Sequence, residues 1–201
     1  PTIEFSYKCD ALDDPLLNSY HALALKLAKG EAIGAFRRDI QLVFQDAFSA
    51  VNPRKTVREI VSEPLRHLLC LSREARARRV EEMLLAVDLA PSLLDKRPAQ
   101  VSGGQLQRVC IARAVACQPE IILFDEAISS LDAHTQVQIM DLLRELKEKL
   151  GLTYVFITHD LTSITYLCDD VLFLYQGHVT EYLPVSRISE AKDEYARRLL
   201  E

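Results

Sequence analysis

The sequence predicts an α/β fold in which a parallel sheet is flanked by helices, and three segments of its second half carry that prediction. Residues 121–124 (IILF) and 154–157 (YVFI) are apolar runs without polar alternation, as expected of strands buried on both faces of a parallel sheet. Between them, apolar residues mark one face of a helix: Ile139, Leu142, Leu143, Leu146 and Leu150. Gly151 stands where the C-cap of this helix is expected. A strand, a helix and a strand at this spacing form a βαβ unit.

The first part of the chain contains shorter patterns. The alternation of Leu23, Leu25 and Leu27 favours a strand, followed by a turn at residues 29–31 and the start of a second strand at residues 32–33. Residues 36–45 favour a short apolar strand after a basic turn.

A helical region begins at Val57, and Pro98 closes it. Its clearest apolar stripe consists of Val80, Met83, Leu84 and Val87. After the βαβ unit, residues 171–175 predict a further apolar strand, with a turn at residues 176–177 leading into Val179.

Composition and charge narrow the class of protein. The chain has 201 residues, of which 49% are hydrophobic and 26% are charged, which suits one globular domain. A net charge of −5 gives no electrostatic support for nucleic acid as a partner. No apolar run approaches the roughly 18 residues of a membrane span, and the first residues do not resemble a signal peptide, so we expect a cytoplasmic protein. The five cysteines contain no C-x-x-C pair, which favours reduced thiols over a zinc site.

Two polar clusters follow the two buried strands. Asp125 and Glu126 end the first strand, and Thr158 and His159 end the second. Because the carboxyl ends of parallel strands meet at one rim, where ligands bind, both clusters are expected at the same edge. An Asp there suits Mg²⁺, a Glu can act on a water, and a His can contact a γ-phosphate. Taken alone, each cluster favours the simpler interpretation of polar residues that cap strands.

A third cluster opens a helix. Ser102 and Gln105 are three residues apart and form a capping-box pattern, with Gly103 and Gly104 between them. Glycines at a helix N-terminus leave main-chain N–H groups bare where the helix dipole favours anions, which predicts a phosphate-binding end. The alternative is a well-capped helix after a glycine turn.

The order of these clusters resembles that of the ATP-binding-cassette (ABC) ATPase family. Residues 101–108 resemble its signature motif, 121–126 its Walker B motif, 129–132 its D-loop and 157–160 its switch-histidine motif, while Gln45 resembles the Q-loop glutamine. The resemblance runs from about residue 36 to the end of the chain. It implies a P-loop NTPase-like sheet flanked by helices and a helical signature lobe. It also implies a single domain over residues 1–201, with a RecA-like core at 1–45 and 117–201 and a helical subdomain at about 46–116.

The family resemblance implies ATP and Mg²⁺ as cofactors and gives roles to matching residues. Asp125 would hold Mg²⁺ through water, with Gln45 approaching the same ion. Glu126 would act on the hydrolytic water, and His159 would sense the γ-phosphate.

A second set of residues would serve the nucleotide of another chain in a head-to-tail dimer. Ser102, Gly103 and Gly104, with Gln105 beside them, would contact the γ-phosphate of ATP bound to that chain. Asp132 would lie at the dimer interface.

Other segments indicate the subfamily of ABC ATPases that the chain resembles. Residues 36–41 (FRRDIQ) and 49–54 (SAVNPR) resemble dipeptide, oligopeptide and nickel importers, while 94–98 (LDKRP) and 105–110 (QLQRVC) resemble nickel-import ATP-binding subunits. The resemblance implies two integral-membrane permease subunits and a second cassette as partners. A periplasmic or extracellular binding protein would be involved indirectly, without nucleic acid, at the cytoplasmic face of the inner membrane.

One family motif is missing. The sequence contains no Gly-Lys dipeptide, which the P-loop motif G-x-x-x-x-G-K-[ST] requires. Residues 29–34 resemble the strand that leads into the P-loop, yet only ten residues separate Gly34 from Gln45. A phosphate loop and its helix of roughly 12 residues do not fit there. We therefore expect an internal deletion near residues 34–35 that removes the central P-loop helix, weakens the chain's own ATP site and uncovers apolar surface.

Three functions stay open at this point. The chain can be a transport ATPase subunit, or a non-catalytic remnant that at most supplies its signature motif to a partner. The third function is that of a soluble cassette in DNA repair or translation. Proteins of that class usually have long insertions or a second cassette, and this sequence shows neither.

Phe5 and Tyr7 are candidates for stacking on adenine. The histidines outside the motifs do not cluster, which argues against nickel ligands: His21, His67, His134 and His178.

Overall fold

The computed structural model describes residues 33–200. The chain divides into two compact units, residues 1–37 and residues 38–201. The strand predicted at residues 23–27, the turn at 29–31 and the adenine candidates Phe5 and Tyr7 lie outside the described residues.

The helices and strands alternate along most of the chain. The α-helices are α2 (Ile33–Asp39), α3 (Val57–His67), α4 (Arg73–Ala86), α5 (Gly103–Val115), α6 (Ala133–Leu150), α7 (Leu161–Leu167) and α8 (Glu194–Leu200). The strands are β1 (Ile40–Phe44), β2 (Ile121–Asp125), β3 (Thr153–Ile157), β4 (Asp170–Tyr175) and β5 (His178–Pro184). Short 3₁₀ turns are η1 (Pro91–Leu93), η2 (Pro98–Gln100) and η3 (Val185–Glu190). Within the described residues, no helix has the length and apolarity needed to cross a membrane.

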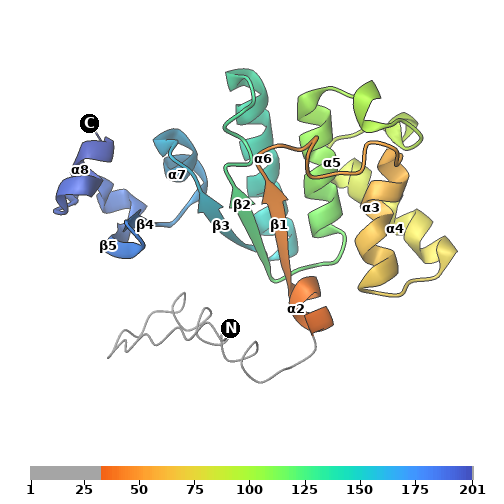
Figure 1. Ribbon diagram of the computed structural model, residues 1–201, viewed down its shortest axis with the longest axis horizontal. Helices are drawn as coiled ribbons and strands as arrows, with labels where there is room; N and C mark the ends of the chain where they lie inside the picture. The colour runs from red at the N-terminus through yellow and green to blue at the C-terminus, as the bar shows by residue number, and fades with distance from the viewer. Residues whose placement is uncertain (1–32, 201) are drawn as a thin grey trace. The chain divides into compact units, whose positions relative to one another are not determined.

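Strands β1, β2 and β3 form a parallel sheet in that order, and Figure 1 shows them side by side. The register pairs Phe44 with Asp125 and Asp125 with Ile157, so the carboxyl ends of the three strands are level. The prediction of a parallel βαβ unit is therefore confirmed. Strands β4 and β5 pair separately as an antiparallel hairpin around the predicted turn at residues 176–177.

One face of the parallel sheet packs against the main core. Val43, Ile122 and Phe124 have no exposed surface and belong to the main core, together with apolar residues of α5 and α6. The ring of Phe124 stacks on Phe156 at 4.6 Å and meets the edge of Tyr154 at 5.1 Å. This aromatic cluster packs side by side across β2 and β3 on the core face.

The other face of the same sheet exposes apolar side chains. Leu42 and Phe44 on β1 are 37% and 45% exposed, and Ile157 on β3 is 50% exposed. Parallel sheets are normally covered on both faces, so the exposure of these three side chains is unusual for such a sheet.

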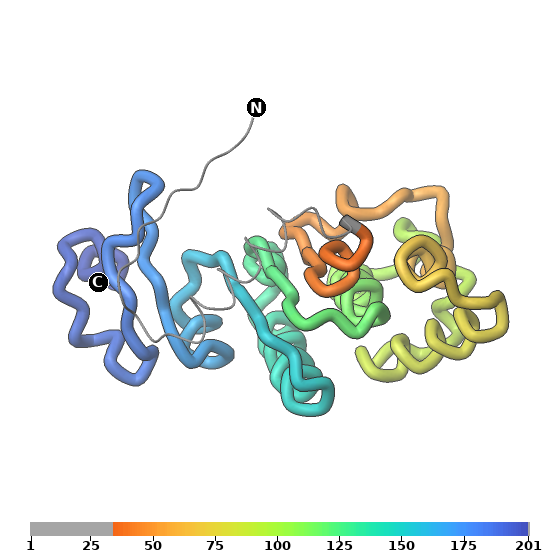
Figure 2. The backbone as a smooth tube through the Cα atoms, turned by 90° about the horizontal axis from the view of Figure 1, so that it is seen from below, coloured from red at the N-terminus to blue at the C-terminus, as the bar shows by residue number. Residues whose placement is uncertain are grey.

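Helices α3, α4 and α5 pack against one another, and they lie together in both Figure 1 and Figure 2. Each begins at a side-chain cap, namely Thr56, Ser72 and Ser102. The apolar stripe predicted on residues 80–87 is buried, with Val80, Met83 and Leu84 inside α4.

The start of the described region corrects one prediction. Ile33 and Gly34 lie in helix α2, and the expected basic turn at Arg37 and Arg38 is part of the same helix. Two apolar residues carry little information about a strand, whereas Ala and Arg are strong helix formers. The interpretation of residues 29–34 as a strand that leads into a phosphate loop is therefore wrong for Ile33 and Gly34.

Candidate functional site

The level carboxyl ends of the three strands bring the predicted site residues to one edge. Gln45 follows β1, Glu126 follows β2, and His159 lies two residues beyond the end of β3. The main-chain N–H of Glu126 donates to the carbonyl of Ile157 at 2.9 Å, which ties the ends of β2 and β3 together. The prediction that both polar clusters share one rim is confirmed.

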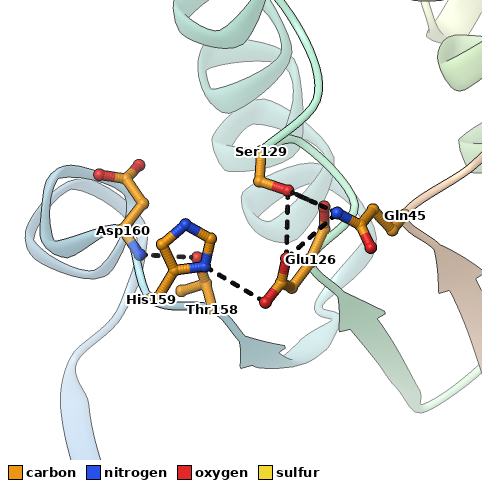
Figure 3. A network of polar contacts seen from close by, with 6 residues as sticks. All are labelled: Gln45, Glu126, Ser129, Thr158, His159 and Asp160. Carbon is orange, nitrogen blue, oxygen red and sulfur yellow. Dashed lines mark hydrogen bonds and ion pairs between the residues drawn. The ribbon is translucent and has the colours of Figure 1, made fainter.

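The carboxylate of Glu126 is the centre of a polar network (Figure 3). Gln45 Nε2 donates to Glu126 Oε2 at 3.2 Å, and His159 Nδ1 lies 3.2 Å from Oε1. Ser129 joins the network because its Oγ lies 3.3 Å from Gln45 Nε2 and 3.4 Å from Glu126 Oε2. Residues from three strand ends therefore converge on one carboxylate.

The backbone of Glu126 is held in an uncommon conformation. Its φ is +46°, in the left-handed region that non-glycine residues rarely adopt. Two groups of Ser129 hold the Glu126 carbonyl, with the main-chain N–H donating at 3.1 Å and Oγ donating at 2.9 Å. Strained backbone at a strand end persists only where its surroundings fix it, and such sites are frequently functional.

His159 is positioned by the start of α7. The neighbouring Asp160 caps this helix and accepts from the main-chain N–H groups of Thr162 at 3.0 Å and Ser163 at 3.1 Å. Burial opposes ionisation of Asp160, but the hydrogen bonds from Ser163 and Thr162 outweigh it and lower the pKa of this carboxyl. The cap therefore holds Asp160, the neighbour of His159, at the start of α7, whereas the side chain of His159 is 69% exposed.

The N-terminus of α5 confirms the predicted capping box. Gln105 N–H donates to Ser102 Oγ at 3.2 Å, and Ser102 N–H donates to Gln105 Oε1 at 3.0 Å. A Cβ added at Gly103 would meet nothing within 4 Å, whereas one added at Gly104 would lie 2.6 Å from Thr135 Cγ2. Gly103 thus faces open space, and Gly104 permits a close contact with α6.

Asp132 caps α6 and lies beside this contact. Its carboxylate accepts from Thr135 N–H at 3.0 Å and from Thr135 Oγ1 at 2.7 Å. The Thr135 hydroxyl, followed by the Thr135 main chain, lowers the pKa of the exposed Asp132 carboxyl. Thr135 therefore joins two predicted site residues, Asp132 and Gly104, that lie far apart in sequence.

The carboxyl end of the parallel sheet can hold Mg²⁺ only if waters or phosphate oxygens supply further ligands. Asp125 is half-buried at the end of β2. Within the described residues, no three His, Cys, Asp or Glu side chains are grouped to hold a metal ion. Mg²⁺ commonly takes one or two carboxylates and completes its shell with waters and phosphate oxygens, so Asp125 suits it only beside a bound phosphate.

The sequence contains no Gly-Lys dipeptide and therefore no phosphate-loop motif, in which main-chain N–H groups cradle the phosphates and a Lys pairs with their oxygens. The contacts of Ser129 with Glu126 and of Thr135 with Asp132 were not predicted from the sequence, although a hydroxyl residue three positions after a carboxylate is a usable signal for a local hydrogen bond.

Comparison with known proteins identifies the family. The family model described as "ABC transporter" matches residues 19–129, more than half of the chain. The chain is 54% identical over 147 residues to the nickel import ATP-binding protein NikE of Escherichia coli (strain K12), covering 73% of this chain and 55% of that protein. NikE of Shigella dysenteriae gives the same values. The chain thus spans about half the length of these curated relatives.

Solved structures support the same assignment. The ATP-binding cassette MJ0796, as a dimer bound to ADP and phosphate, matches with a TM-score of 0.65 and 37% identity over 75% of this chain and 65% of that chain. CbiO1 of Clostridium perfringens, part of the ABC transporter complex CbiONQ, matches with a TM-score of 0.69 and 29% identity over 82% of this chain and 64% of that chain. The chain therefore belongs to the ABC transporter family of ATP-binding cassettes and has the α/β fold of that family.

Proposed function

We propose that this chain is the ATP-binding subunit of an ABC importer whose cargo is nickel, with peptides as the alternative cargo. The 54% identity to nickel import ATP-binding proteins supports nickel. The subunit would work at the cytoplasmic face of the inner membrane with two permease subunits and a second cassette. A periplasmic or extracellular binding protein would deliver the cargo to the permeases.

We infer that the chain's own ATP site is defective. Glu126 and His159 would do the acid–base work, and Asp125 and Gln45 would hold Mg²⁺ through water; the contacts of Gln45 and His159 with the Glu126 carboxylate support these roles. When bound, Mg²⁺ and ATP would supply charge neutralisation and the scissile phosphate. Without a phosphate loop these side chains have no fixed nucleotide beside them, and several charge-assisted hydrogen bonds of about 1.5–3 kcal/mol each are lost.

The N-terminus of α5 supports a one-sided role. The single observation that carries it is the open space in front of Gly103 at the start of a capped helix of 13 residues. Such an end attracts phosphate through its bare N–H groups and its dipole. In a heterodimer with an intact cassette, Ser102, Gly103 and Gly104 would complete the ATP site of the partner, with Gln105 and Asp132 holding the two helix ends in place.

We also propose that the chain is one nucleotide-binding domain with two parts. Helices α3, α4 and α5 would form the signature lobe at about residues 46–116, and residues 1–45 and 117–201 would form the core. The alternative function is a remnant without turnover, and the missing phosphate loop is the observation that favours it.

A matched pair of variants separates these functions. Ser102→Asp and Ser102→Asn both keep a good N-cap, but only Asp brings a negative charge to the phosphate-binding end. The chain is mixed with a cassette that carries an intact G-x-x-x-x-G-K-[ST] motif, and ATP turnover is measured. The proposal predicts turnover that requires this chain, survives Ser102→Asn and is lost with Ser102→Asp. If ATP turnover by the partner cassette is the same without this chain, with it and with either variant, the chain is a remnant.

A further inference from the structure

Within the part of the chain that the structure describes, β3 is an edge of the parallel sheet, because it pairs with β2 alone. Two main-chain hydrogen bonds show which of its residues face β2. Thr153 N–H donates to the carbonyl of Glu120 at 3.0 Å, and the carbonyl of Ile157 accepts from Glu126 N–H at 2.9 Å. Because successive strand residues direct their N–H and C=O groups to opposite sides, residues 153, 155 and 157 face β2 and the two residues between them face outward.

The outward groups belong to Tyr154 and Phe156. Among the described residues, no second strand pairs with them. Their side chains are held on the core face, where the two rings pack against Phe124 with centroid distances of 5.1 and 4.6 Å. The open edge therefore presents two N–H and two C=O groups on a strand whose position is fixed by core packing.

Strand β3 lacks three features with which proteins commonly protect an open edge. Residues 153–157 (TYVFI) contain no charge and no proline, and their register with β2 runs without a bulge. Ile157 is 50% exposed, and Val155 is partly exposed on the same face of the sheet. A strand added here would have apolar neighbours on both faces, and a charge buried beside them would be costly. The edge thus favours an uncharged strand.

The spacing of the free groups and the surroundings of the edge define the occupant. Donors and acceptors that recur every two residues match extended backbone, which has the same period. Figures 1 and 2 show α7 and β4 beyond β3, on the side away from β2, where they would obstruct the whole sheet of a second copy. We propose that the open edge of β3 docks one extended, uncharged segment of a partner chain as a fourth strand. Main-chain hydrogen bonds to Tyr154 and Phe156 would provide the affinity, and apolar side chains on both faces the specificity.

A synthetic peptide with the sequence of residues 120–126 (EIILFDE) is the probe for this edge. Its central residues are uncharged, its acidic ends keep it soluble, and the same segment already pairs with β3 on the other side. The control peptide carries Ile122→Pro and Leu123→Pro, which remove N–H donors from both of its edges.

Amide hydrogen exchange of the chain is the readout. In the chain alone, the Val155 N–H, which faces β2, should exchange at least about tenfold more slowly than those of Tyr154 and Phe156. The probe should slow exchange at Tyr154 and Phe156 about tenfold and leave Val155 unchanged. The control peptide should change none of the three.

Two variants of the chain locate the bound probe. Val155→Glu places a charge beside the open edge and should abolish the protection of Tyr154 and Phe156. Leu42→Glu is the matched control, because it places the same charge on the same face of the sheet but on β1, across β2 from the edge. The two peptides compared on the wild-type chain decide the question if Val155→Glu fails to fold.

Three results would overturn the proposal. The first is unchanged exchange at Tyr154 and Phe156 with the probe at millimolar concentration. The second is protection that rises with the concentration of the chain alone, which identifies a second copy as the occupant. The third is full protection in the dilute chain alone, which shows that another part of the same chain fills the edge. No step of the test involves ATP, so its outcome is independent of the proposed function.

Discussion

A Cβ placed on Gly104 would lie 2.6 Å from Cγ2 of Thr135, so the N-termini of α5 and α6 approach closely and any side chain at position 104 would force Thr135 to shift. Thr135 also donates to the carboxylate of Asp132. Gly104 thus has a packing role that does not depend on its proposed contact with phosphate.

Gly104→Ala should therefore destabilise the protein. We expect the free energy of unfolding to fall by about 1–2 kcal/mol, because the added methyl group overpacks the contact with Thr135. Thr135→Ser removes the clashing Cγ2 but keeps the hydroxyl, so it should recover most of this loss in the double variant. Gly103→Ala, which meets open space, is the control and should change stability by less than about 1 kcal/mol. Equal losses at both glycines in urea denaturation would contradict the packing argument.

The two faces of the parallel sheet should respond differently to polar substitution. Leu42→Thr on the exposed face should change stability by about 0.5 kcal/mol or less and reduce the binding of a hydrophobic dye. Val43→Ala on the buried face should cost about 2 kcal/mol, because it leaves a cavity in the core. The pair is compared by thermal denaturation and dye fluorescence. Strong destabilisation by Leu42→Thr, or a wild-type melting temperature well above those of ordinary mesophilic domains, would argue against an exposed apolar face.

The described cysteines should differ in reactivity. Cys70 is exposed, whereas burial raises the pKa of the Cys117 and Cys168 thiols to about 11 and also raises the pKa of Cys110. Only the thiolate reacts with alkylating agents, so at neutral pH Cys70 should be modified far faster than the other three. Peptide mass spectrometry after brief alkylation measures each site. Rapid modification of Cys110 in the folded chain would show that the core is open.

The isolated chain should bind ATP only at millimolar concentration and show no measurable turnover. The reason is the missing phosphate cradle rather than any fault in Glu126 or His159, which are in contact at 3.2 Å. Isothermal titration with Mg²⁺-ATP, and with ADP as a comparison, measures the affinity. Micromolar binding would mean that another part of the chain holds the phosphates.

Much of this fold can be predicted from local patterns. The runs at 121–124 and 154–157 identify β2 and β3 because strands buried on both faces need continuous apolar sequence. The positive φ of +65° at Gly151 matches its predicted role as a C-cap. The helix at 33–39 was missed because its short, basic sequence has no apolar stripe that distinguishes it from a turn.

The site is only partly predictable. Glu126 and His159 could be placed at one edge because parallel strands end together, whereas Gln45 was assigned to the site only through the family resemblance. The contact of Gly104 with Thr135 and the hydrogen bond from Gln107 to Phe44 join residues 31 and 63 positions apart. No local pattern encodes such contacts, since they depend on how α5 packs against α6 and β1.

The most direct measurement compares Glu126→Gln with Ser102→Asp in the mixture of this chain and an intact partner cassette. In the proposed one-sided function, Glu126 would serve the chain's own site, whereas Ser102 would serve the site of the partner. We predict that steady-state ATP turnover is unchanged by Glu126→Gln and is reduced to that of the partner alone by Ser102→Asp. Loss of turnover with Glu126→Gln, or full turnover with Ser102→Asp, would contradict the one-sided account.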